Sequence, residues 1–197
     1  MKVLKNFPNI IQTLYYDCGA TALMSVLMHY NIYPRLKTLK KETETKKSGT
    51  SPEKLVEVSK RYGVKAKLLE NMSIRDLEKK VDMGCPVLIS IQIKRSSDIP
   101  LSKVWGNGHF VVVIGYNREN IYFADPMFSF TTFLKKTELE ERWHDSDNYN
   151  NRKRIRREKY GIEFDPPNNW KEDNKPKHLI KTLSKLVEEY EVNNLKK

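Results

Sequence analysis

The residues best suited to chemistry lie in one stretch near the N-terminus, QTLYYDCGATALMSVLMHY, at positions 12–30. Cys18 starts an apolar run with helical periodicity. The free N–H groups and positive dipole end of a helix N-terminus favour the thiolate, which is the nucleophilic form of cysteine. Gly19 is expected to leave the approach to the sulfur open. The side-chain amide of Gln12 and the backbone N–H of Cys18 are two donors suited to holding the oxyanion of a tetrahedral intermediate.

A cysteine nucleophile needs a general base, and the chain has four histidines. His29 follows Cys18 by eleven residues on the same predicted helix, which is roughly 16 Å along the helix axis, so it cannot reach the sulfur. His144 and His178 fall at or beyond the end of the predicted compact domain. His109, at the entry to a predicted strand and close behind two glycines, is therefore the candidate base.

An imidazole base also needs an acceptor that fixes its orientation. Asp125, sixteen positions after His109, ends the next predicted strand in the motif FADP. A tight turn between the two strands would place Asp125 opposite Val112 rather than His109. We therefore expect a β-bulge or a bend near the strand ends to bring the carboxylate to the imidazole.

Each of these residues also has a structural interpretation. A free cysteine on an apolar helix is commonly a packing residue, and an aspartate before proline commonly forms a turn. Cys85 is interpreted as a core thiol, with a resolving role toward Cys18 as the alternative. Trp105 either lines a cleft near His109 or anchors the surface. The joint pattern of residue types in their predicted elements is what indicates catalysis.

The predicted elements are mainly helices first and strands second. Apolar periodicity and capping residues predict helices at 18–30, 35–44, 52–62 and 73–83, with Asp17 as the N-cap of the first. Alternating β-branched and aromatic residues predict strands at 64–69, 86–93, 109–116, 121–125 and 128–134. A capping box from Thr137 to Glu140 predicts a short helix ending near Trp143. This order indicates an α+β domain spanning residues 1–145.

The composition narrows the class of protein. The chain has 197 residues, a net charge of +11 and a hydrophobic share of 39%, which is enough for a core. Neither a secretory signal nor a membrane-spanning run is visible, so a cytoplasmic location is expected. The two cysteines make no disulfide framework, and nothing accompanies them in metal-ligand spacing. No metal or cofactor is expected.

Residues 146–197 are predicted to form a basic C-terminal extension. The run RKRIRR at 152–157 raises nucleic-acid binding as an alternative, but no recognised motif accompanies it, so a solvated basic face is favoured. The segment 178–192 predicts an amphipathic helix that packs on the domain or on a partner. The sequence leaves the oligomeric state open.

The motifs QTLYYDCGATAL, GTSPEKLVEVSKRYGVKAK, GCPVLISI, GHFVVVIGY and FADP occur in this order between about residues 9 and 143. They resemble the papain-like cysteine peptidases that process bacteriocin precursors, the double-glycine leader peptidases. The resemblance implies a papain-like fold, in which a helix with the cysteine packs on an antiparallel sheet with the histidine and aspartate. By position, Cys18 resembles the nucleophile, His109 the general base, Asp125 the orienting group and Gln12 the oxyanion donor.

The resemblance also implies hydrolysis of a peptide bond in a peptide or protein substrate through an acyl-enzyme, without metal or cofactor. No transmembrane or nucleotide-binding segment accompanies the motifs, so we expect a standalone member. A non-catalytic peptide-binding module on the same fold is the first alternative, disfavoured because all four site positions are present. An amidase or acyltransferase with the same Cys–His pair stays open. A nucleic-acid-binding protein built on the basic segment is the remaining alternative.

Overall fold

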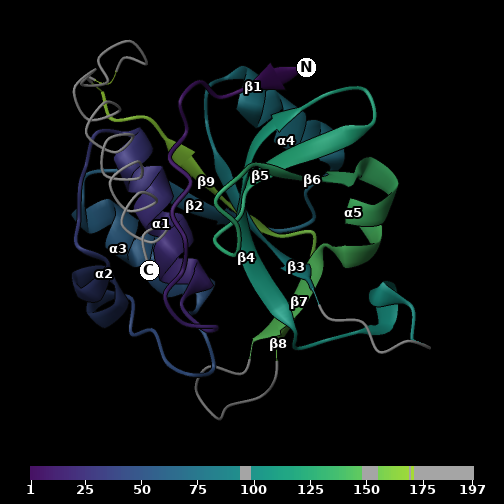
Figure 1. Cartoon of the computed structure of the whole chain (residues 1–197), viewed down its shortest axis with the longest axis horizontal. Helices are drawn as coiled ribbons and strands as arrows, with labels where there is room; N and C mark the ends of the chain where they lie inside the picture. The colour runs from purple at the N-terminus through teal and green to yellow at the C-terminus, as the bar shows by residue number, and fades with distance from the viewer. Residues whose placement is uncertain (94–98, 148–154, 169, 171–197) are drawn as a thin grey trace, which may run out of the picture.

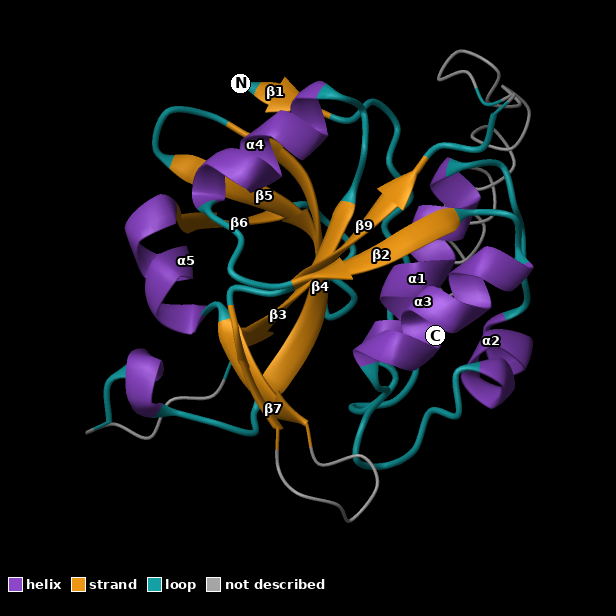
Figure 2. Cartoon of the chain, turned by 180° about the vertical axis from the view of Figure 1, so that it is seen from behind, coloured by secondary structure: helices purple, strands orange, loops and turns teal. Residues whose placement is uncertain are grey.

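The computed structural model of the chain describes residues 1–93, 99–147, 155–168 and 170. Within these residues a seven-stranded antiparallel sheet separates two groups of helices (Figures 1 and 2). The helices are α1 (Cys18–His29), α2 (Leu36–Glu42), α3 (Pro52–Arg61), α4 (Ile74–Asp82), α5 (Lys136–Arg142) and the short 3₁₀ helix η1 (Leu101–Lys103). The strands are β1 (Lys2–Val3), β2 (Lys65–Leu69), β3 (Val87–Gln92), β4 (Gly108–Tyr116), β5 (Asn120–Ala124), β6 (Thr132–Lys135), β7 (His144–Asp147), β8 (Ile155–Glu158) and β9 (Gly161–Asp165).

The sheet runs in the order β2-β9-β3-β4-β5-β6, with β1 paired to β4, and β7 and β8 form a separate hairpin. Side chains alternate between its faces and so form two cores. One core joins the sheet to α1, α2 and α3, and the other joins it to α4 and α5. None of the helices in the described part of the chain is long and apolar enough to cross a membrane.

Helix capping follows the sequence at two helices and departs from it at two others. Ser51 caps α3 and Ser73 caps α4, each through its side-chain hydroxyl. Asp17 makes no side-chain cap on α1, because its carboxylate is engaged elsewhere. The predicted capping box from Thr137 is also wrong: α5 has Lys135 rather than Thr137 at its N-cap position, two residues earlier, and has no side-chain cap.

The sheet continues past residue 145, where the sequence predicted the end of the domain. β9 lies between β2 and β3 and pairs with both. Trp170 packs against the core beneath α1 and donates its indole N–H to the carbonyl of His29, at 3.1 Å. The boundary is therefore corrected, because a strand from the expected extension completes the sheet. The predicted amphipathic helix at 178–192 lies outside the described residues.

A β-bulge in β4 decides which face of the sheet Asp125 lies on. The register between β4 and β5 shifts by one residue at Ile114. Without the shift, Asp125 would lie opposite Val112 on the neighbouring strand, and the side chain of Val112 belongs to the core beneath α1. With the shift, the position of Asp125 lies opposite Val111. Side chains alternate along a strand, so Val111 and His109 share one face of the sheet, and Asp125 joins them there. The bulge that the sequence required is thus present.

We predict that β9 contributes to the stability of the whole domain. Ile162 is fully buried between β2 and β3, so Ile162→Ala should lower the free energy of unfolding by about 2–5 kcal/mol. Ile155→Ala is the matched control: this isoleucine, in β8, is 51% exposed, and its loss should change stability by no more than about 0.5 kcal/mol. Urea unfolding measures both. An equally small effect at the two positions would contradict the role of β9.

Candidate active site

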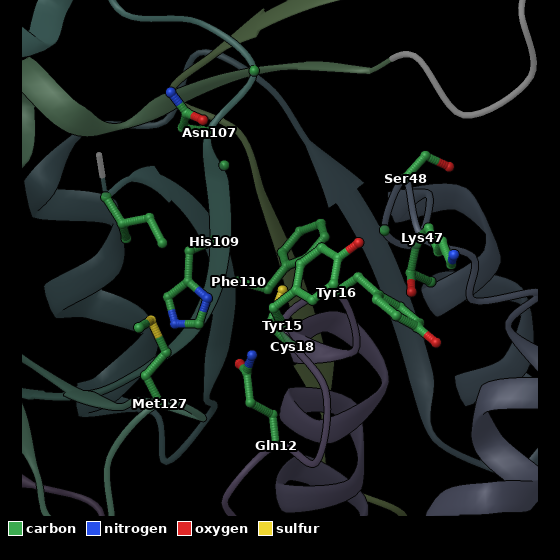
Figure 3. A pocket seen from close by; sticks show the side chains of 15 residues that line it. Gln12, Tyr15, Tyr16, Cys18, Lys47, Ser48, Asn107, His109, Phe110 and Met127 are labelled. Carbon is green, nitrogen blue, oxygen red and sulfur yellow. The ribbon is translucent and has the colours of Figure 1, made fainter. Parts of the chain in front are cut away.

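A cleft of about 420 Å³ opens where the N-terminus of α1 meets the start of β4 and the loop between α2 and α3. Cys18, His109 and Gln12 all line this cleft. Figure 3 shows the imidazole of His109 and the amide of Gln12 near the sulfur of Cys18. Tyr15 and Met127 add exposed apolar surface to its walls. The structure thus brings three of the four predicted site residues to one solvent-accessible space.

The fourth residue, Asp125, lies behind the histidine. Its Oδ1 is 2.7 Å from Nε2 of His109, and both side chains are buried. The carboxylate is held in turn by the backbone N–H of Met127, at 2.9 Å, and by the hydroxyl of Thr132, at 3.5 Å. A fixed carboxylate of this kind sets the orientation of the imidazole ring.

Cys18 is the other group that acts on the imidazole. Its thiol raises the pKa of His109 and lines the same cleft as the ring. Because Nε2 is engaged with Asp125, Nδ1 is the nitrogen left for the sulfur. Asp125 is thus bonded to His109, and His109 shares the cleft with Cys18.

The electrostatics of these three residues favour a charged imidazole. Burial of the ring lowers the pKa of His109, but the hydrogen bond to Asp125, followed by the hydrogen bond and charge of Cys18, outweighs burial and raises the pKa from 6.5 to about 9. An imidazolium beside a thiol stabilises the thiolate. The raised pKa also means that protonation of His109 stabilises the fold fully below about pH 6.5, and this contribution is lost as the pH rises through about 9.

Gln12 sits on the loop before α1 with its amide oriented by the chain itself. Nε2 donates to the carbonyl of Leu14 at 2.8 Å, and the backbone N–H of Gln12 donates to the carbonyl of Pro126 at 2.8 Å. A flipped amide would put two oxygen atoms against each other, so the Leu14 carbonyl fixes the orientation. An amide NH₂ has two hydrogens, and the second stays available for a group bound in the cleft.

Comparison with known proteins identifies the family. A family model described as the Peptidase_C39 like family matches residues 4–151. The chain belongs to this family. No curated protein sequence matches the chain.

Several solved structures share the fold of this Peptidase_C39 like chain. The peptidase domain of Streptococcus ComA, a bi-functional ABC transporter involved in a quorum sensing pathway, matches with a TM-score of 0.62 and 22% identity, over 82% of this chain and 99% of that one. A Bacillus anthracis protein assigned to the C39-like peptidases gives 0.64 and 22%, over 83% and 96%. A double glycine motif protease from the AMS/PCAT transporter, in complex with the leader peptide, gives 0.58 and 17%, over 84% and 99%. This likeness establishes the expected α+β papain-like fold.

The glycine after the cysteine also has a purpose that was not expected. Gly19 is buried, and a Cβ on it would lie 3.1 Å from both the Phe110 ring and the Thr50 side chain. It therefore allows the first turn of α1 to pack closely on β4, which brings Cys18 to the strand that holds His109. Close packing is thus a second reason for glycine at this position, and open access to the sulfur stays a prediction.

A buried carboxylate beside the start of β4 was not anticipated from the sequence. Asp145 accepts hydrogen bonds from the Ser90 hydroxyl at 2.9 Å and from the Gln92 amide at 3.3 Å, and burial raises its pKa. A Cβ on Gly108 would lie 1.7 Å from its Oδ2, so only glycine fits directly before His109. The signal in the sequence was the pair of polar residues, Ser90 and Gln92, inside an otherwise apolar strand.

The two residues with open interpretations resolve as structural. The ring centres of Trp105 and His144 lie 4.5 Å apart in a tilted arrangement, and the guanidinium of Arg156 lies 4.8 Å from the centre of the Trp105 ring, so Trp105 anchors the β7–β8 hairpin. Cys85 is a buried free thiol whose pKa is raised by burial. No group of three or more His, Cys, Asp or Glu side chains suited to a metal ion occurs among the described residues.

We predict that Asp125 maintains the protonated state of His109. With four histidines in the chain, NMR of labelled imidazoles should resolve a His109 titration near pH 9. In Asp125→Asn the ring stays buried but loses its charged partner, so the pKa should fall by about 1–3 pH units. The other three histidines serve as internal controls. A His109 titration near 6.5 in both proteins would contradict this electrostatic account.

Proposed function

We propose that this member of the Peptidase_C39 like family is a cysteine peptidase that cleaves its substrate through an acyl-enzyme on Cys18. The main support is the buried hydrogen bond between Asp125 and His109, which shares a cleft at the N-terminus of α1 with Cys18. Nucleophile, base and orienting acceptor are the three groups that acyl transfer by a thiol requires.

The proposed reaction follows from these positions. The Cys18 thiolate attacks the scissile carbonyl carbon, and the carbonyl oxygen becomes an oxyanion facing the free N–H of the Gln12 amide and the backbone N–H of Cys18. The intermediate collapses as His109 transfers its proton to the leaving amine, which leaves a thioester. Neutral His109 then takes a proton from water, the resulting hydroxide attacks the thioester, and the acid product leaves as the Cys18–His109 ion pair is restored.

We further propose a substrate whose scissile bond follows two glycines. The support is the likeness to a double glycine motif protease with a leader peptide bound. The exposed Tyr15 and Met127 side chains give the cleft apolar walls suited to a peptide. The intact set of Cys18, His109 and Asp125 argues against a binding module that has lost its chemistry. A cytoplasmic location stays a prediction.

The described part of the basic run gives little support to nucleic-acid binding. Arg157 is paired with Glu53 and Glu70 and is largely buried by them. Arg156 lies over the Trp105 ring. Phosphate binding needs cations that are free to approach a backbone of phosphates, and these two side chains are engaged within the domain.

We predict that hydrolysis depends on Cys18 and not on Cys85. A peptide ending in Gly-Gly and coupled to 7-amino-4-methylcoumarin should be cleaved by the wild type, with release of fluorescence. Cys18→Ala should reduce kcat by at least about 10³-fold without loss of folding, because the nucleophile is removed. Cys85→Ala is the matched control and should keep wild-type turnover. Full activity in Cys18→Ala would refute the assignment.

A further inference from the structure

We infer that the buried ion pair between Asp17 and Lys40 is the positioning device of the oxyanion site. It acts through the loop that joins Gln12 to Cys18, and it sets the direction of the Gln12 amide. This inference rests on the proposed peptidase function. It assigns a role to two residues outside the Cys18, His109, Asp125 and Gln12 set.

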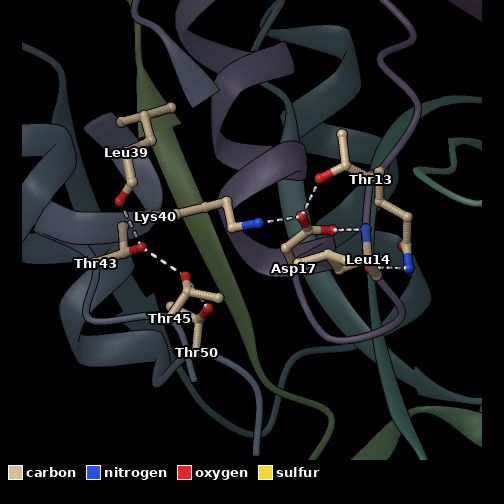
Figure 4. Close-up of polar contacts among 9 residues, drawn as sticks. Thr13, Leu14, Asp17, Leu39, Lys40, Thr43, Thr45 and Thr50 are labelled. Atoms are coloured by element: carbon tan, nitrogen blue, oxygen red, sulfur yellow. Dashed lines mark hydrogen bonds and ion pairs between the residues drawn. The ribbon is translucent and has the colours of Figure 1, made fainter. Parts of the chain in front are cut away.

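Asp17 turns its side chain away from α1 and back onto the loop before it (Figure 4). Its carboxylate is fully buried directly before Cys18. Oδ2 accepts hydrogen bonds from the Thr13 hydroxyl at 2.7 Å and from Nζ of Lys40 at 2.8 Å. Oδ1 accepts one from the backbone N–H of Leu14 at 3.1 Å. Three donors thus converge on one carboxylate, and two of them belong to the loop.

Leu14 connects this carboxylate to the oxyanion donor. Its backbone N–H is held by Asp17, and its carbonyl accepts the hydrogen bond from Nε2 of Gln12 at 2.8 Å. Displacement of Leu14 would therefore move the amide with it. Because an oxyanion donor works only within a narrow range of distances, a shift of this kind acts on the reaction rather than on the fold.

Lys40 makes the buried charge of Asp17 tolerable. Burial opposes ionisation of the carboxyl group, but the hydrogen bonds from Lys40, Thr13 and Leu14 outweigh it and lower the pKa of Asp17. The ammonium comes from α2 and also lies 5.7 Å from the centre of the Tyr16 ring. Without this partner the carboxylate would be a buried unpaired charge, which is strongly unfavourable.

Helix α2 is also connected to Thr50, another residue that lines the cleft. Thr43, which directly follows α2, donates to the carbonyl of Leu39 at 2.7 Å, and its hydroxyl is 2.9 Å from that of Thr45. Thr45 in turn is 2.7 Å from the hydroxyl of Thr50, which lines the cleft and faces Gly19. Helix α2, which carries Lys40, is therefore linked by polar contacts both to the loop before α1 and toward Thr50 (Figure 4).

Two reactions of the same sulfur separate positioning from folding. Hydrolysis of the Gly-Gly coumarin peptide passes through an oxyanion, whereas alkylation of Cys18 by iodoacetamide does not. In Lys40→Met we expect kcat to fall by about 10–100-fold at an unchanged KM, because the amide acts only on charge that develops in the transition state. The alkylation rate should stay within about 3-fold of wild type, since the Cys18–His109 pair is untouched.

Three further variants sharpen the test. Lys40→Arg retains the positive charge and should recover most of kcat. Lys41→Met removes the neighbouring exposed lysine of α2 and should leave both reactions unchanged. In a Gln12→Ala background, Lys40→Met should cost little more, because the group that it positions is already absent. Asp17→Asn repeats the comparison from the other side of the pair, should Lys40→Met fold poorly.

The contrary outcomes are distinct. Equal losses of alkylation and hydrolysis would indicate a purely structural pair and overturn the inference, and so would losses that add fully to those of Gln12→Ala. A wild-type protein that alkylates rapidly at Cys18 but hydrolyses no Gly-Gly peptide would overturn the proposed function itself, and the inference with it.

Discussion

A hydrogen bond of 2.7 Å between His109 and Asp125 holds an imidazole in a buried position where an isolated charge would be unfavourable. The carboxylate and the thiol of Cys18 together outweigh the effect of burial, so the pKa of His109 rises to about 9 and the ring stays protonated near neutral pH. The proposed chemistry depends on this balance. In the proposed reaction, this ring stabilises the thiolate of Cys18 and has a proton to transfer to the leaving amine.

The rest of the domain provides the geometry for that contact. The bulge at Ile114 moves Asp125 onto the face of His109, and Gly19 allows α1 to approach β4 closely. β9 completes the same sheet between β2 and β3. A buried ion pair at Asp17 is proposed to fix the remaining donor, the amide of Gln12. Packing brings Cys18 to His109, and polar contacts orient the imidazole and the Gln12 amide.

Much of the fold and site could be predicted from the sequence, because periodicity and capping signals are local. The helix starting at Cys18, the strands around His109 and Asp125 and the need for a bulge all follow from spacing. The missing parts are non-local. Nothing near Asp17 in the sequence indicates that Lys40, 23 residues later, neutralises it. Likewise, the sequence of β9 was assigned to a polar C-terminal extension, although its alternating residues Ile162 and Phe164 face the core.

Cys18 and His109 are proposed to form an activated pair, and the pH dependence of alkylation tests this pairing most directly. Iodoacetamide labelling, followed by intact mass and peptide mapping, would be compared in wild type and His109→Ala. The account predicts rapid labelling of Cys18 alone, well below the ordinary thiol pKa of about 8.5, and loss of this reactivity without His109. Slow labelling of Cys18 and Cys85 alike, indifferent to His109, would contradict it.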